Sequence, residues 1–279
     1  MRVDAHQHFW HYNPVRDRWI GESMHLLRRD FLPDDVARAL RAANINAVVA
    51  VQADQSERET DLLLAMARLY PVVRGVVGWV DLRAENLSER LDRWQGSRHL
   101  KGFRHIAQAE PDDFLVDARI VKGVQELGTH GLSFDLLVYP RQLVAADMLV
   151  GECGDTMFVL DHGGKPPIAS GVVGDWAQEL RKISRHPNVV CKVSGLVTEA
   201  SWGTWTPQHI MPSLDTLLDC FGPDRLMFGS DWPVCLLAAD YSRVHDLIAQ
   251  WATKLSGDEQ ARLFGGTAAR VYRLEEHGP

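Results

Sequence analysis

Eight short apolar runs follow one another along this chain, and a helical pattern comes after each of them. Each run has the length of a strand, and most of them are rich in valine, leucine and other apolar residues, as strands buried on both faces are. Parallel strands need a crossover connection, which is usually a helix. The alternation therefore predicts an α/β fold built on eight parallel strands. The runs lie at residues 3–8, 47–52, 72–80, 100–104, 132–138, 157–162, 189–193 and 226–230.

Eight strand–helix units are the number found in a (β/α)8 TIM-like barrel. An open, doubly wound sheet is the alternative, but no G-x-G-x-x-G motif follows the first run to support it. The glycine-rich stretch at residues 161–165 does not match a phosphate-binding loop either. Because no low-complexity segment or linker divides the chain, the sequence predicts one barrel domain over residues 1–279.

Some helix boundaries carry local signals. Pro33 is followed by two aspartates and is typical of a first helical turn. Ser56 and Glu59 have the spacing of a capping box, in which each side chain accepts a hydrogen bond from the other residue's backbone. Gly128 is a suitable stop for the helix that precedes the fifth run.

The composition limits the partners of the protein. The formal net charge is -7, and acidic and basic residues are interspersed, which argues against nucleic acids and acidic membrane surfaces as partners. The four cysteines lie far apart and form no C-x-x-C pair, as expected of reduced thiols. No apolar run reaches membrane-spanning length, and we expect no signal peptide, because Met1 and Arg2 lead directly into the first run. We therefore expect a soluble cytoplasmic protein.

Polar side chains gather where the predicted strands end, which is where barrel enzymes place their active sites. Alternate residues of a strand share a face, so His6 and His8 should point the same way, about 6.5–7 Å apart along the chain. Burying unpaired polar groups costs several kcal/mol, so a cluster of them indicates chemistry rather than packing. The residues at these ends are His6, His8, Gln52, Arg104, His105, His162, Lys192, Ser194 and Asp231.

The histidines and the carboxylate of this set suit a hydrolysis. Asp231 can take a proton from water and later pass it to a leaving oxygen. His6, His8 and His162 can polarise a carbonyl, hold the water or, together with Asp231, ligate one zinc or manganese ion. A second ion is not expected, because the run at 100–104 ends in Arg104 instead of a lysine and the run at 132–138 has no histidine at its end.

Six motifs spread over nearly the whole chain carry a resemblance to a known family. They are Asp4-Ala5-His6-Gln7-His8-Phe9-Trp10, Leu27-Arg28-Arg29-Asp30-Phe31, Lys101-Gly102-Phe103-Arg104-His105, Leu160-Asp161-His162-Gly163-Gly164-Lys165-Pro166, Cys191-Lys192-Val193-Ser194-Gly195-Leu196 and Met227-Phe228-Gly229-Ser230-Asp231-Trp232-Pro233. These motifs and their order in the chain resemble those of the amidohydrolase superfamily. Within it, they are most similar to the branch of sugar lactonases that act on L-fuconolactone or L-rhamnonolactone. The resemblance implies a barrel whose catalytic positions are His6, His8, His162 and Asp231. It also implies either one zinc or manganese ion at these residues or lactone hydrolysis without a metal.

Further residues near the strand ends are candidates for binding the substrate. Arg104 and Lys192 could contact it or form ion pairs inside the barrel, and Lys165 could reach it from the rim. A tryptophan could stack on a sugar ring or pack within a lid. Residues 199–205, which hold two tryptophans, should overhang the site because they follow the seventh run. The substrate-binding set is Gln52, Arg104, Lys192, Trp10, Trp202 and Trp205.

We therefore expect an enzyme that opens a small-molecule sugar lactone, most specifically L-fuconolactone or a close relative, with Asp231 activating water. Two alternatives stay open, a metal-dependent decarboxylase with the same site residues and a catalytically silent sugar-binding barrel. The sequence does not indicate an oligomeric state. Eight further histidines fall in loops or on helices and are predicted to lie outside the site: His11, His25, His99, His130, His186, His209, His245 and His277.

Overall fold

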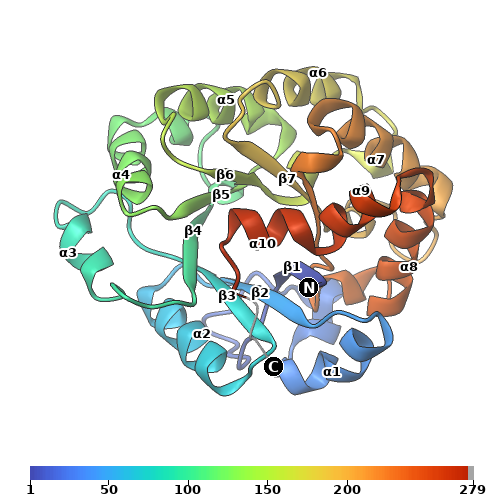
Figure 1. The fold of residues 1–279 in the computed structure, drawn as a ribbon, viewed down its shortest axis with the longest axis horizontal. Helices are drawn as coiled ribbons and strands as arrows, with labels where there is room; N and C mark the ends of the chain where they lie inside the picture. The colour runs from blue at the N-terminus through green and yellow to red at the C-terminus, as the bar shows by residue number, and fades with distance from the viewer. Residues whose placement is uncertain (276–279) are drawn as a thin grey trace.

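Eight parallel strands form a nearly closed barrel, in the order in which they occur in the chain (Figure 1). This computed structural model describes residues 1–275, so the prediction for His277 lies outside the described residues. Each predicted run overlaps one strand, which confirms the (β/α)8 fold class. The strands are β1 Val3–Gln7, β2 Ala47–Val51, β3 Val73–Gly78, β4 Leu100–Ile106, β5 Ser133–Leu137, β6 Phe158–Leu160, β7 Val189–Val193 and β8 Leu226–Phe228.

Helices surround the barrel, as Figure 1 shows. Their apolar faces and the outer faces of the strands form one large core, which holds most of the buried leucine and phenylalanine side chains. Within residues 1–275, no helix is long and apolar enough to cross a membrane. The helices are α1 Pro33–Ala42, α2 Glu57–Leu69, α3 Leu87–Asp92, α4 Ala118–Thr129, α5 Leu143–Glu152, α6 Gly174–Ile183, α7 Pro207–Phe221, α8 Tyr241–Trp251, α9 Gly257–Ala261 and α10 Thr267–Val271.

The first and last strands close the barrel through a few contacts just beyond the end of β8. Gln7 and Trp232 form a single parallel bridge. The backbone N–H of Asp231 donates to the carbonyl of His6 at 2.9 Å, and the N–H of His8 donates to the carbonyl of Trp232 at 2.7 Å. Two of the predicted site segments therefore meet at the seam of the barrel.

A second, smaller core fills the inside of the barrel toward the amino-terminal ends of its strands. It combines small strand residues such as Val49, Val159 and Val190 with the side chains of Val271 and Leu274 from the carboxyl-terminal segment. Figure 1 shows α10 lying across this end of the barrel, close to the amino terminus. The carboxyl-terminal segment therefore closes the barrel at the end opposite the predicted site.

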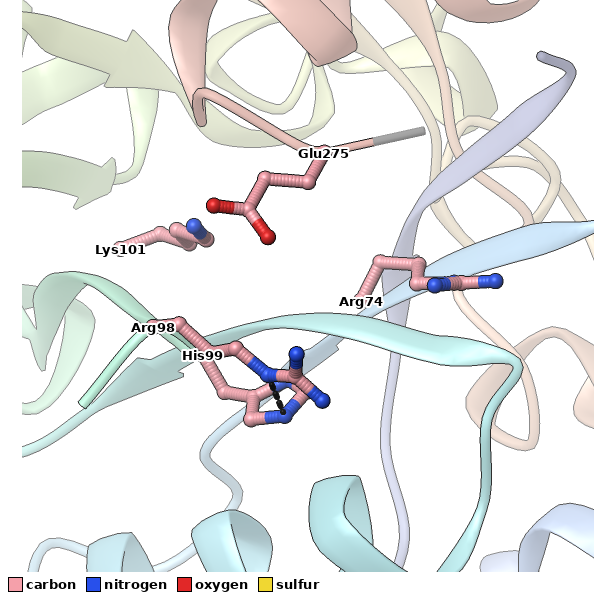
Figure 2. A pocket seen from close by; sticks show the side chains of 5 residues that line it. All are labelled: Arg74, Arg98, His99, Lys101 and Glu275. Carbon is pink, nitrogen blue, oxygen red and sulfur yellow. Dashed lines mark hydrogen bonds between the residues drawn. The ribbon is translucent and has the colours of Figure 1, made fainter. Parts of the chain in front are cut away.

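A small basic pocket lies at the same end of the barrel. Figure 2 shows its lining residues, Arg74, Arg98, His99, Lys101 and Glu275, with the Nε of Arg98 donating to Nε2 of His99. Burial, followed by the positive charge of Arg273, lowers the pKa of Lys101. Because Nζ of Lys101 donates to the carbonyl of Arg273 at 3.1 Å, it ties β4 to the carboxyl-terminal segment.

The helix boundaries agree with the sequence signals except in two details. Helix α1 begins at Pro33 as predicted. Ser56 accepts from the N–H of Glu59, but the Glu59 carboxylate accepts from the N–H groups of Ala53 and Asp54, so the reciprocal half of the capping box is absent. Helix α4 runs one residue past Gly128, because the left-handed backbone that stops it lies further on, in the turn before β5.

Candidate active site

The four predicted catalytic residues converge at the carboxyl-terminal end of the barrel. Nε2 of His6 and Nε2 of His8 lie 3.2 Å apart. Oδ1 of Asp231 lies 3.7 Å from Nε2 of His6, 3.4 Å from Nε2 of His8 and 3.9 Å from Nε2 of His162. None of the four residues is more than 5% exposed. The strand-end prediction thus picked out groups that share one buried centre.

The backbone is unusual at two of these residues. His162 and Asp231 have φ angles of 54° and 59°, in the left-handed region that side chains other than glycine seldom adopt. Gly195 lies so close to the His162 ring that a Cβ there would stand 2.5 Å from Nδ1, and a Cβ at Gly229 would stand 2.7 Å from Cβ of His6. The chain therefore accepts local strain and close packing to aim these side chains inward.

A register shift in β1 directs His6 into the barrel. Ala5 already belongs to the inner core, so strict alternation would turn His6 outward. The pairing of β1 with β2 is irregular between Asp4 and Gln7, and Asp4 accepts from the N–H of His6 at 3.2 Å. Such irregularities re-aim side chains beside active sites.

The hydrogen bonds of His8 set its tautomer. Its Nδ1 lies 2.8 Å from the carbonyl oxygen of Val51, which can only accept, so Nδ1 carries the hydrogen. The other ring nitrogen, Nε2, faces His6 and Asp231. Nδ1 of His162 lies 2.8 Å from the hydroxyl of Ser194, which can donate or accept, so His162 can hold its hydrogen on either nitrogen.

Asp161 and Lys192 lie beneath the His6 ring. Nδ1 of His6 is 3.3 Å from Oδ1 of Asp161 and 3.2 Å from Nζ of Lys192. Lys192 has no exposed area and pairs with Asp161 at 3.0 Å and with Asp135 at 2.7 Å. Burial alone would raise the pKa of Asp161, but Lys192 and then His6 hold it well below its usual range.

Arg104 and Gln52 form a second pair beside the histidines. One guanidinium nitrogen of Arg104 donates to Asp161 at 3.0 Å and lies 3.3 Å from Nε2 of His6. Another donates to the side-chain oxygen of Gln52 at 3.1 Å and to its backbone carbonyl, and Gln52 donates back to the carbonyl of Arg104. Gln52, Arg104 and Lys192, predicted to bind substrate, thus lie in the inner wall of the site with these partners.

The sequence analysis assigned no role to Asp161, Asp135 or Tyr272. Asp161 stands next to His162 in a motif that had been noticed, and Asp135 is a lone carboxylate in an otherwise apolar strand, so both carried a signal. The hydroxyl of Tyr272 donates to Oδ2 of Asp135 at 2.7 Å from far along the chain. No local sequence pattern predicts a contact between two residues so far apart in the chain.

The three predicted tryptophans differ in exposure. Trp10 and Trp205 are buried, and their indole N–H groups donate to the backbone carbonyls of Arg29 and Ala238. Trp202 is 40% exposed in the loop after β7, with its N–H bound to the carbonyl of Thr198. Trp202 is therefore the one of the three with a free ring surface.

Lys165, the predicted rim residue, connects two loops of the catalytic end. Its Nζ donates to the carboxylate of Glu199 at 2.6 Å, which joins the loop after β6 to the loop after β7. Both side chains are partly exposed. Lys165 also has left-handed backbone angles, with φ at 53°, so the loop from His162 onward is held in an uncommon shape.

Burial and mutual charge set the protonation states. Burial lowers the pKa of His162 to about 4, an effect that Asp231 and then Asp161 partly offset. Burial likewise lowers the pKa of His6 well below its usual value. Burial alone would raise the pKa of Asp231, but His162, a hydrogen bond from His8 and the charge of His6 hold it below its usual range. At neutral pH, the neutral imidazoles of His6 and His162 therefore face an ionised carboxylate.

The donor set fits one divalent cation. The side chains of His6, His8 and Asp231 offer two ring nitrogens and one carboxylate oxygen, with pairwise distances of 3.2, 3.4 and 3.7 Å. Bonds of about 2.0–2.1 Å to a tetrahedral zinc would separate neighbouring ligand atoms by about 3.3–3.5 Å. A second group of His6, Asp161 and His162 shares His6 with the first. Because Asp161 already pairs with Lys192 and Arg104, the first group is the better fit.

The whole described barrel matches a known family model. The match covers residues 3–274 and is to the model described as amidohydrolase. The chain belongs to the amidohydrolase family. The amidohydrolase resemblance drawn from the six motifs is thereby confirmed, and the match extends from the candidate site to the segment that closes the other end of the barrel.

Two curated relatives align with the amidohydrolase over nearly its full length. An L-fucono-1,5-lactonase from Burkholderia multivorans is 44% identical over 288 residues, which cover 99% of this chain and 97% of the relative. An L-fucono-1,5-lactonase from Burkholderia ambifaria is 34% identical over 285 residues, covering 99% and 96%.

A solved structure of an amidohydrolase from Burkholderia multivorans with bound Zn has the same fold. Its TM-score is 0.96 at 45% identity, and the alignment covers 99% of this chain and 100% of that one. The zinc in that structure is consistent with a divalent metal at the donor set of His6, His8 and Asp231.

Proposed function

We propose that this amidohydrolase hydrolyses the ester bond of a sugar-acid lactone, most specifically L-fuconolactone or a close relative, to the free aldonic acid. The observation that carries the proposal is the buried centre in which three histidines surround the ionised Asp231. The identity of 44% with a relative named L-fucono-1,5-lactonase supports the choice of substrate. The four cysteines are free, which supports a cytoplasmic location.

Asp231 is the proposed base. Its carboxylate accepts a proton from water as the water oxygen attacks the lactone carbonyl. The tetrahedral intermediate then expels the ring oxygen, and Asp231 returns the proton to that oxygen. The product carboxylic acid ionises and releases one proton to the solvent near neutral pH. The low pKa of Asp231 keeps the base ionised but also makes it weak, so the water needs further activation.

The proposed cation site supplies that activation. A divalent ion held by His6, His8 and Asp231 would polarise the carbonyl and make the attacking water more acidic. The surrounding charges favour such an ion. Asp161 pairs with Lys192 and Arg104, and Asp135 with Lys192, whereas among the described residues only histidines lie within ion-pair distance of Asp231. The proposed ion is zinc or manganese, because both metals bind nitrogen and oxygen ligands.

His162 and the loop after β7 have proposed roles in holding the lactone. With its hydrogen on Nε2, His162 can donate to the lactone carbonyl while Nδ1 accepts from Ser194. Trp202 offers a ring face to the apolar side of a sugar. Arg104 is proposed to act at the inner wall, where one guanidinium nitrogen lies 3.3 Å from Nε2 of His6, and Gln52 is proposed to hold Arg104 there.

A screen of aldonolactones with a pH indicator tests this function. Ring opening should acidify an unbuffered solution, with the largest rate for L-fuconolactone or an epimer, and chelation of the metal should lower that rate. A decarboxylase would release carbon dioxide from an aromatic acid and leave the lactones intact. Binding of lactones without any acidification would point to the silent sugar-binding alternative and would overturn the proposal.

Elemental analysis of the purified protein tests the metal site separately. We expect at most one zinc or manganese ion per chain, because His6 can join only one of the two candidate groups at a time. Two tightly held ions per chain would contradict this assignment.

A further inference from the structure

A column of buried polar side chains runs through the barrel from its closed end to the candidate site. Tyr272, next to α10, donates its hydroxyl hydrogen to Oδ2 of Asp135 at 2.7 Å. Lys192 donates to the same oxygen at 2.7 Å. The ammonium of Lys192 also lies 3.0 Å from Asp161 and 3.2 Å from Nδ1 of His6. We call Tyr272, Asp135 and Lys192 the polar column.

Three buried partners surround the ammonium of Lys192. It donates to Asp135 at 2.7 Å, forms an ion pair with Asp161 at 3.0 Å and lies 3.2 Å from Nδ1 of His6. None of these side chains is exposed to solvent. The position of the ammonium beneath His6 therefore depends on the three partners together, and water cannot replace one that is lost.

Tyr272 supports this arrangement in two ways. Its hydroxyl adds a hydrogen bond to the Asp135 carboxylate, and its ring centroid lies 5.4 Å from Nζ of Lys192, within the range of a cation–π interaction. Asp135 in turn is steadied by the hydroxyl of Ser133, at 3.2 Å from Oδ1. The carboxyl-terminal segment thus reaches the underside of the site through one side chain.

We propose that Tyr272 is a positioning residue for the candidate active site. Its hydroxyl holds Asp135 and Lys192 in the polar column, so that Lys192 keeps its contact with Nδ1 of His6 and the ring of His6 keeps its orientation. The segment that closes one end of the barrel thereby helps to arrange the chemistry at the other end. The kinetic consequence rests on the proposed lactonase function, whereas the structural consequence does not.

The test compares Tyr272→Phe with a packing control. Tyr272→Phe keeps the ring in the inner core and removes only the hydroxyl. Leu274→Ala removes apolar contacts from the same segment without touching Asp135. Asp135→Asn removes the charge itself and should have the larger effect if it folds, but Tyr272→Phe decides the question because it keeps the shape of the core.

For the kinetics, the hydroxyl should matter to turnover and not to binding. We expect kcat of Tyr272→Phe for the best lactone to fall about three- to tenfold, as for the loss of one hydrogen bond, with KM within about twofold of wild type. Leu274→Ala should melt at a lower temperature but keep the wild-type kcat well below its melting point. Equal kcat values for Tyr272→Phe and wild type would overturn the proposal.

A second readout needs neither lactone nor metal. In metal-free protein carrying 15N-labelled histidine, the ring nitrogen signals of His6, assigned by their loss in His6→Asn, should shift in Tyr272→Phe and stay in place in Leu274→Ala. If the His6 signals do not change in Tyr272→Phe, Tyr272 contributes only to packing and the positioning role is wrong. If wild type opens no lactone while the His6 signals do shift, the proposed function fails and the positioning role stands.

Discussion

The two ends of this barrel differ in what they bury: ionisable side chains lie at one end and apolar side chains at the other. At the catalytic end, His162 and Asp231 adopt left-handed backbone angles and bury ionisable groups, each of which costs stability. At the other end, small aliphatic side chains and the carboxyl-terminal segment pack into an apolar core. The comparison teaches that the residues proposed for activity are largely separate from those of the apolar core, with Tyr272 as the proposed link between them. Substitutions such as Asp231→Asn and Leu274→Ala should therefore separate kcat from the free energy of unfolding.

The largest expected effect is at the catalytic end. Asp231→Asn removes the proposed base but keeps the size and the buried position of the side chain, so kcat should fall by about 10²–10⁴-fold. The melting temperature should change little in comparison. Steady-state kinetics and a thermal melt on the same sample check both statements. Retention of more than a tenth of the wild-type kcat would remove Asp231 from the role of base.

The closed end should show the reverse behaviour. Leu274→Ala leaves a cavity in the inner core, and truncations of this kind lower the free energy of unfolding by about 2–5 kcal/mol. Denaturant titration measures the loss, and Leu274→Met is the matched control because it nearly conserves volume. A kcat that falls in proportion to the stability would show that the two ends are not independent.

Acid should weaken the metal-free protein through the catalytic end. The pKa of His162 is about 4 in the folded protein, against an ordinary value of 6.5. Between these values the unfolded chain binds a proton that the folded protein does not, so the free energy of unfolding falls as the pH drops from 6.5 to 4. The difference in pKa corresponds to about 3 kcal/mol.

Denaturant titrations of metal-free wild type and His162→Asn at pH 7 and pH 4.5 measure this effect. The variant lacks the group, so its stability should depend less steeply on pH over this window. The lowered pKa of Asp231 acts at more acidic pH and does not interfere. Identical pH dependence in the two proteins would mean that His162 is not the group that resists protonation.

The smallest expected effect is at the rim of the catalytic end. Trp202→Ala removes an exposed ring, so kcat/KM for sugar lactones should fall about three- to tenfold, and unequally among epimers, with little change in melting temperature. Trp202→Phe is the control that keeps a stacking face. If the alanine variant keeps the wild-type rates and rank order of lactones, this loop does not select the substrate.

The sequence predicted local structure well because the signals for it are local. The eight apolar runs and the barrel follow from alternation alone, and β7 begins and ends where its run does. Strands β6 and β8 end two residues before their predicted limits, since His162 and Asp231 leave the regular backbone to point inward. The prediction from the strand ends still identified both residues, because it depends on their position after a strand and not on their backbone angles.

The rest of the site depends on contacts between distant segments. Tyr272 meets Asp135 across the inner core, and no spacing within either segment indicates such a pair. The exposure of the tryptophans was equally hidden, because Trp205 and Trp202 stand in one loop and yet one is buried and the other is not. Composition and periodicity report which residues are apolar, whereas three-dimensional packing decides which way each one turns.

The seam between β1 and β8 links the assembly of the site to the completion of folding. The N–H of Asp231 donates to the carbonyl of His6. The pairing that closes the barrel therefore brings together His6, a proposed metal ligand near the start of the chain, and Asp231, the proposed base near its end. Contacts between such distant positions carry a high entropic cost of loop closure and form slowly. Every earlier strand can be in place while the two halves of the site are still apart. During refolding, helical signal should therefore return before lactone opening does, and a chain interrupted before β8 would hold most of a barrel but lack the proposed base.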